Sequence, residues 1–173
     1  MTYTGMETEE LIKRIHVLLT GKEPTVQDVK RTEPGVGAFA GWNVGIGYQW
    51  TAPELPETLY PLIVIGANSE RSDYGRKGRD QYPVDLIMMI KAQRVNADIV
   101  GDKSITRAWA NLEALLIANG KLRDKMDVAY CDGILSASVR YGVRMKQQTN
   151  DIDEYTAMAT VIYHKYTQLR SER

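Results

Sequence analysis

Apolar residues recur at helical spacing in two stretches of the chain. In the first stretch, residues 8–20, the apolar stripe consists of Leu11, Ile12, Ile15, Leu18 and Leu19. This spacing predicts an amphipathic helix over 8–20. Thr8 suits its N-cap, and Gly21 suits a left-handed turn at its end. His16 falls just off the stripe, so we expect it at the surface.

The second helical stretch covers residues 101–120. Its apolar stripe consists of Ile105, Ala108, Trp109, Leu112, Leu115 and Leu116. We expect Asp102 or Ser104 to cap this helix and Gly120 to end it, because these residue types are favoured at those positions.

Residues 41–52, GWNVGIGYQWTA, alternate with the period of two that is typical of a strand. The apolar face consists of Trp42, Val44, Ile46, Tyr48 and Trp50. The opposite face is almost bare, and glycine within a strand often marks a close approach of other backbone. We expect the aromatic face to pack on the protein's own core or on a neighbouring molecule. A covered internal strand is the alternative.

Other strands are expected on both sides of this segment. A short strand is predicted around 26–31, an apolar one at 59–66, and one at 82–94 that is buried on at least one face. A proline-rich connector precedes the second of these. The segment 67–81 has no periodicity and is rich in charge, which predicts a long polar loop.

The C-terminal third alternates most regularly. Apolar and polar residues alternate over 135–146 and again over 155–164, with the turn-forming segment QQTNDIDE between them. Each strand of this hairpin is about 40 Å long at roughly 3.4 Å per residue. The hairpin is therefore expected to overhang the core. The order of elements predicts an α+β fold, with an antiparallel-rich mixed sheet and both main helices on one face.

Composition narrows the possible classes of protein. The chain has 173 residues, so we expect a single domain over 1–173. Basic and acidic residues balance at 22 each, which creates no overall field that attracts nucleic acid. The single cysteine, Cys131, excludes an intramolecular disulfide. With no secretory signal pattern and no long apolar run, the chain is expected to be soluble and intracellular when made.

Catalytic signatures are weak throughout the sequence. The glycines in GVGAFAG imitate a dinucleotide-binding loop, but they precede a strand pattern rather than a helix. His16 and His164 have no second ligand at metal-binding spacing, so both are expected at the surface. Cys131 is expected to be a thiol of the core or of a turn. We therefore expect that the protein is not an enzyme and that it has no catalytic residues, bound metal or cofactor.

Three segments are candidates for interaction. The first is the aromatic strand, with Trp42, Tyr48 and Trp50. The second is the loop 67–81, which carries Arg71, Tyr74, Arg76, Lys77 and Arg79 and could order on a partner or clamp a phosphate backbone. The third is the expected hairpin tip, where Asp151 and Asp153 are either a solvated turn or an acidic contact for a basic partner.

The sequence resembles the tail terminator, or tail completion, family of long-tailed bacteriophages. The resemblance lies in the order of elements after residue 8. It consists of the helix EELIKRIHVLL, the strands YPLIVIGANSE and YPVDLIMMIKAQR around a polar loop, the helix SITRAWANLEALLIANGKL, and the closing pair ILSASVRYGVRMKQ and EYTAMATVIYHKYTQ. The segment 34–52 has no counterpart in the family pattern.

The resemblance implies a structural role without catalytic residues. A hexameric ring would sit on the tail tube, stop its polymerisation and present a surface to the head connector. Its partners would be further copies of the chain, the tail tube protein and a head-connector or head-completion protein. DNA would only pass through the channel. The protein would be assembled in the host cytoplasm and located in the virion at the head–tail junction, with no membrane contact.

Two alternatives remain from the sequence. One is another tail or neck component, such as a tail tube subunit, which would stack without limit. The other is a small nucleic-acid-binding α+β module or enzyme that uses the basic residues of 67–81, for which salt-dependent DNA binding is the expected signature.

Overall fold

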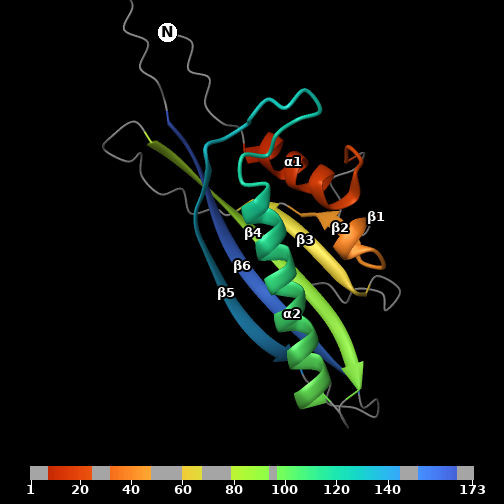
Figure 1. The fold of residues 1–173 in the computed structure, drawn as a ribbon. Helices are drawn as coiled ribbons and strands as arrows, with labels where there is room; N and C mark the ends of the chain where they lie inside the picture. Colours follow the sequence, from red (N-terminus) through yellow and green to blue (C-terminus); the bar gives the residue numbers. More distant parts are fainter. Residues whose placement is uncertain are drawn as a thin grey trace, which may run out of the picture.

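The computed structural model describes residues 8–24, 32–47, 60–67, 79–93, 97–144 and 152–166. Over these ranges the chain forms two α-helices and six strands, arranged as Figure 1 shows. In chain order these elements are α1 (Thr8–Thr20), β1 (Glu33–Pro34), the 3-10 turn η1 (Gly37–Phe39), β2 (Asn43–Ile46), β3 (Leu62–Ala67), β4 (Arg79–Gln93), α2 (Ala97–Ala118), β5 (Gly133–Arg144) and β6 (Ile152–Tyr166).

The strands form one mixed sheet in the order β1-β2-β3-β4-β6-β5. Neighbouring strands are antiparallel except β2 and β3, which run parallel. Both helices lie on the same face of this sheet (Figure 1). The predicted α+β class, with an antiparallel-rich sheet and a C-terminal hairpin, is confirmed.

The hydrophobic core lies between the helices and the sheet. The stripes of α1 and α2 pack on alternate residues of the central strands, and Ile63, Leu86 and Ala157 on those strands are fully buried. Leu62, Val64 and Met89 form a smaller buried cluster separate from this core. Burial on both faces accounts for the nearly continuous apolar run of β3.

Helix α1 has the predicted bounds, and Gly21 follows it with φ at +71°. The expected surface position of His16 is wrong, because its side chain is buried. The last residue of α1 and the residues that follow it cover this side chain. His16 Nδ1 lies 3.2 Å from Thr20 Oγ1 and 3.0 Å from the carbonyl oxygen of Lys22. The helical spacing of apolar residues does not indicate that another part of the chain covers His16.

Helix α2 starts at Ala97, so the expected cap at Asp102 or Ser104 is wrong. Both residues lie inside the helix, with Gly101 beside them. The apolar stripe of α2 is as predicted, with Ile105, Trp109 and Leu112 buried. Packing of this stripe on the sheet stabilises the helix even where it contains residues of low helix propensity.

Over 41–47, the described part of the tryptophan-rich segment, the strand covers Asn43–Ile46 rather than the whole stretch. It pairs on both sides, with β1 and with β3. The described part of this segment is thus internal, as the alternative interpretation held. The close backbone approach occurs at Gly66, where an added Cβ would lie 2.6 Å from the carbonyl oxygen of Gly47. The strand predicted around 26–31 lies outside the described residues.

The C-terminal hairpin is part of the sheet rather than an overhang. Strand β4 begins at Arg79, inside the segment expected to be a loop, and pairs with β6 from Arg79–Tyr166 to Gln93–Ile152. Strand β5 pairs with the other side of β6. A register shift between Ile134 and Ser136 leaves Leu135 as the extra residue of a bulge.

Candidate interaction surface

The two edges of the sheet differ strongly in length and chemistry. At one edge, β1 has two residues, and one of them, Pro34, has no N–H to donate. At the other edge, β5 has 12 residues, and among the described residues only β6 pairs with it. Short strands and prolines protect an edge from further pairing, whereas a long strand leaves its outer N–H and C=O groups available. The β5 edge is therefore the open one.

The helix-side face of β5 is only partly covered. Tyr141 and Val143 lie opposite Ala157 and Tyr155 of β6, which are buried in the core. Tyr141 is nevertheless 47% exposed and Val143 48% exposed. Together with Leu135 in the bulge, they give the open edge an apolar character.

The opposite face of β5 is polar and basic. Ser138 and Arg140 belong to this face, and Arg140 lies opposite the half-exposed Met158. The strand contains Arg140 and Arg144 but no carboxylate. The edge thus combines an apolar face with a basic one.

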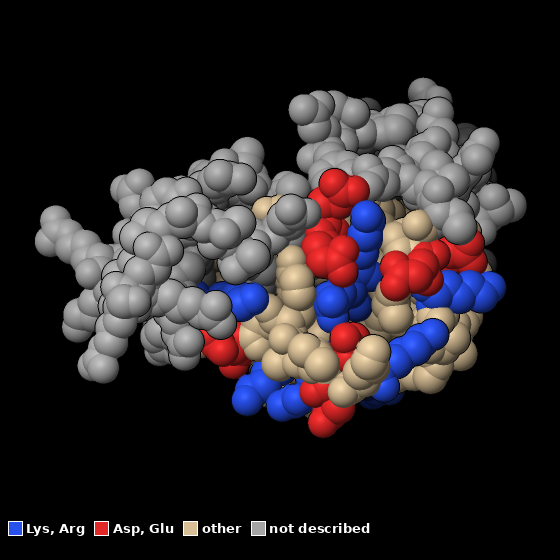
Figure 2. Space-filling model, turned by 90° about the horizontal axis from the view of Figure 1, so that it is seen from above, with Lys and Arg blue, Asp and Glu red and all other residues tan. Residues whose placement is uncertain are grey.

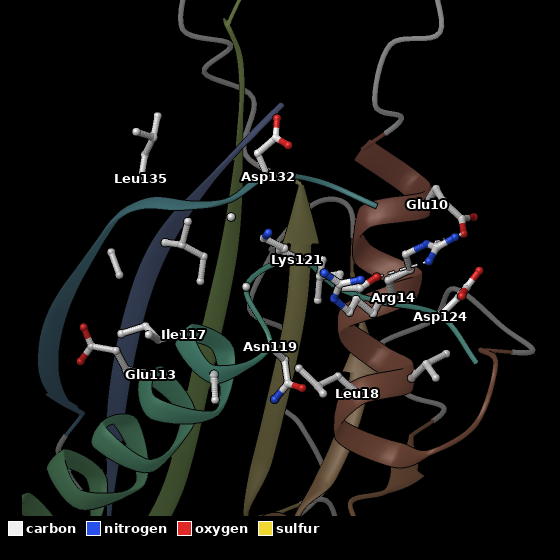
Figure 3. Close-up of a pocket in the computed structure, with 18 of the residues that line it drawn as sticks. Glu10, Arg14, Leu18, Glu113, Ile117, Asn119, Lys121, Asp124, Asp132 and Leu135 are labelled. Atoms are coloured by element: carbon white, nitrogen blue, oxygen red, sulfur yellow. Dashed lines mark hydrogen bonds and ion pairs between the residues drawn. The ribbon is translucent and has the colours of Figure 1, made fainter. Parts of the chain in front are cut away.

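A cleft of about 1210 Å³ continues from the start of β5 to α1 (Figure 3). Its floor crosses the end of α2 and the segment 119–126. Leu135 and Ala137 of β5 line the cleft together with Glu113 and Ile117 of α2. Desolvation by partial burial, and secondarily the Glu113 carboxylate, raise the pKa of Tyr141.

Arg14 holds α1 against the segment that follows α2. Its Nε donates to Glu10 Oε1 at 3.1 Å, and its Nη1 donates to the carbonyl oxygen of Leu122 at 3.3 Å. The guanidinium also lies over the Tyr130 ring, with Cζ 4.5 Å from the centroid. These noncovalent contacts hold together one wall of the cleft.

The loop between α2 and β5 is held in a defined turn at 124–128. Asp124 Oδ1 accepts hydrogen bonds from the N–H of Met126 at 2.8 Å and of Val128 at 2.9 Å. The bond from Val128, with that from Met126, lowers the pKa of the Asp124 carboxyl. This turn keeps the apolar side chains of Met126 and Val128 in solvent beside the cleft.

Charges around this end of the molecule are interleaved. Viewed from above in Figure 2, acidic and basic side chains alternate around uncharged surface rather than gathering by sign. Such a surface does not produce the single-sign field that attracts a phosphate backbone.

The surroundings of the buried reactive side chains indicate a structural role for them. Cys131 is buried, as expected, and its thiol donates to the carbonyl oxygen of Gly120 at 3.1 Å. Desolvation raises the pKa of this thiol, which lowers its reactivity. The expected exposure of His164 is wrong, since β6 places it under the segment before β5, where its carbonyl oxygen accepts the N–H of Asp132. Among the described residues, the buried Tyr163 hydroxyl has no hydrogen-bond partner.

Over the described ranges, no group of three or more histidine, cysteine or acidic side chains could hold a metal ion. In the same part of the chain, no helix has the length and apolarity needed to cross a membrane.

The structure describes only some of the predicted interaction residues. Trp42 is half-buried and packs against the core, edge-to-face on Phe39 with ring centroids 6.0 Å apart. The expected place of Asp153 at the hairpin tip is wrong. It lies in β6 opposite Ala92, and its side chain is buried because it shares the face of Tyr155.

The remaining predicted residues cannot be assigned to a site. Arg79 lies at the start of β4 opposite Tyr166. The others fall outside the described residues: Tyr48, Trp50, Arg71, Tyr74, Arg76, Lys77 and Asp151. For the surface on β5, the sequence predicted only that Tyr141 and Val143 are apolar positions of an alternating strand. Sequence alone gave no signal that β5 would be the edge of the sheet.

Comparison with protein-family models and with curated proteins finds no match for this chain.

Proposed function

We propose that the protein is a structural assembly protein, a ring-forming tail terminator of a long-tailed bacteriophage. In this role, copies of the chain form a hexameric ring on the tail tube, stop its polymerisation and provide the surface to which the head connector or head-completion protein docks. The ring acts in the virion at the head–tail junction, and DNA only passes through its channel.

The observation that carries this proposal is the open β5 edge. A terminator must bind other polypeptide chains at the end of the tube, and a long open sheet edge can take up such a chain as an added strand. Among the described residues, β5 pairs with β6 alone and carries exposed apolar side chains, so its outer edge supplies a docking patch for a partner protein. The interleaved charges around the cleft support contacts with protein rather than with nucleic acid. The order of elements, which resembles the terminator family, supplies the particular role.

The mechanism is binding alone. A terminator that occupies the growing end of a tube replaces a polymerising surface by one that no further tube subunit can bind. Heterologous contacts close into a ring only if the rotation between subunits closes. The ring thereby sets a fixed number of copies and a finite assembly.

The test is assembly in the presence of tail tube protein. Light scattering and negative-stain microscopy should show rings in solution, or single rings at the ends of tubes whose growth has stopped. Unlimited stacks would identify a tail tube subunit instead. A strict monomer that leaves tube growth unchanged would exclude both roles.

A further inference from the structure

The β5 edge has features that specify the chemistry of the segment that would pair with it. An added strand must be extended, because only an extended backbone matches the spacing of groups along a sheet edge. Its side chains alternate between the two faces of the sheet. The two faces of β5 therefore impose two separate requirements on that segment.

On the helix side, the requirement is apolar. Tyr141 and Val143 are each about half exposed, and Leu135 continues the apolar surface towards the cleft. Ile117 of α2, which lines the same cleft, is also largely exposed. Apolar side chains of an added strand would cover these groups and remove them from water. Acidic side chains on this face would instead meet Glu113.

On the opposite face, the requirement is acidic. Arg140 is exposed there and lies opposite Met158 of β6, whereas Arg144 lies opposite Glu154, so Arg140 sets the requirement on this face. Opposite charges in directly facing positions of neighbouring strands stabilise the pair, whereas like charges destabilise it. A carboxylate on the added strand that faces Arg140 would form such an opposite-charge pair with it.

A second copy of β5 is a poor occupant by the same criterion. It would bring Arg140 and Arg144 to an edge that already carries them, with no carboxylate in return. The β1 edge of another copy is also unsuited, because it has two residues and includes Pro34. The occupant is better matched by a different polypeptide segment.

We propose that the β5 edge binds an extended segment of another protein in which apolar and carboxylate side chains alternate. The segment adds to the sheet as a further strand antiparallel or parallel to β5. Its apolar side chains cover Tyr141 and Val143, and a carboxylate pairs with Arg140. This inference rests on the proposed function, because it names the partner chemistry of the same assembly surface.

The test uses the full chain and a fluorescent synthetic peptide of the length of β5 that alternates valine and glutamate. Fluorescence polarisation should detect binding, and amide exchange should slow along β5 when the peptide is present. Three control peptides should bind weakly: one with lysine for glutamate, one with a central proline, and one with the same residues in blocks. Proline removes a main-chain donor, and blocks remove the alternation.

The variant R140E should weaken binding of the glutamate peptide by at least about fivefold and strengthen binding of the lysine peptide. The matched control is R107E, which makes the same substitution at an exposed position of α2. If R140E fails to fold, R140Q supplies the test, with weaker glutamate-peptide binding and no gain for lysine. A merely structural role for Arg140 would not exchange the preference between two peptides.

Equal binding of the glutamate and lysine peptides overturns the inference. So does an edge that stays closed to every peptide because two copies of β5 pair with each other. Failure of this inference is separable from failure of the proposed function. Tube capping without peptide binding rejects the acidic segment alone, whereas peptide binding without rings or capping rejects the terminator role alone.

Discussion

Tyr141 of β5 lies directly opposite Ala157 of β6, yet Ala157 is fully buried and Tyr141 is 47% exposed. The two residues share one face of the sheet. They differ because β6 has strands on both sides, whereas β5 has a strand on one side only among the described residues. An aromatic residue of the core-side face thus reaches solvent at a strand edge that remains available for pairing.

Substitution of Val143 by lysine should prevent assembly without unfolding the protein. Val143 is 48% exposed, so V143K is expected to change the free energy of unfolding by less than about 1 kcal/mol. A lysine on an edge strand opposes the approach of another strand. The matched control is V36K, since Val36 is 49% exposed and lies beyond β1. Negative-stain microscopy should show loss of rings from tube ends for V143K only; loss for both variants would contradict the role of β5.

The unpaired hydroxyl of Tyr163 predicts an unusual effect on stability. A buried hydroxyl without a partner carries a desolvation penalty, so Y163F should leave stability unchanged or raise it by roughly 1 kcal/mol. The same burial raises the pKa of Tyr163, so the group stays protonated. Denaturant unfolding measures the difference.

A second tyrosine provides the contrast. The Tyr60 hydroxyl donates to Glu154 Oε2 at 2.5 Å. Y60F should therefore lower the free energy of unfolding, by roughly 1–2 kcal/mol for a hydrogen bond to a charged acceptor that is partly buried. Equal losses in Y60F and Y163F would show that the Tyr163 hydroxyl has a partner after all.

His16 should make the protein less stable as the pH falls below about 6.5. Desolvation lowers the pKa of the folded-state imidazole, against smaller opposing effects of the Lys22 carbonyl, Glu33 and Glu23. The unfolded chain then binds a proton more readily than the folded one between the two pKa values. Stability from neutral His16 is thus present above the unfolded pKa and is lost as the pH falls through the folded one.

Thermal unfolding at a series of pH values measures this effect. In the variant H16Q the slope of stability against pH over this window should be shallower than in the parent chain. An unchanged slope would assign the acid sensitivity to another group.

Gly66 should be sensitive to a single added carbon. In G66A the new Cβ would lie 2.6 Å from the carbonyl oxygen of Gly47, so backbone must shift. We expect a loss of roughly 1–3 kcal/mol in the free energy of unfolding. The control is G120A, where the nearest atom is 3.4 Å from the added Cβ. Comparable losses in the two variants would remove the close approach as the cause.

Residue periodicity predicted the elements whose burial follows from their own pattern. The stripes of α1 and α2 and the alternation of β6, from Tyr155 to Tyr163, pack as the sequence indicates. Periodicity did not predict where α2 begins, because tertiary packing carries the helix past local signals such as Gly101 and Asp102. Similarly, His16 is buried by chain that follows its helix.

The candidate surface was less predictable than the fold. The alternation of β5 marks Tyr141 and Val143 as core residues, and only the strand order shows that the strand has an open side. Asp153 was expected at a solvated tip because its neighbours are turn-forming residues. The start of β6 at Ile152 places it instead in a paired strand, on the face of Tyr155. Such long-range arrangement has no counterpart in local sequence.

The most direct test of the account is the effect of the protein on growing tail tubes, observed by negative-stain microscopy together with light scattering of the free protein. The account predicts single rings at the ends of tubes that have stopped growing, and loss of those rings in V143K. A protein that stays monomeric at every concentration and leaves tubes growing at their original rate would contradict it.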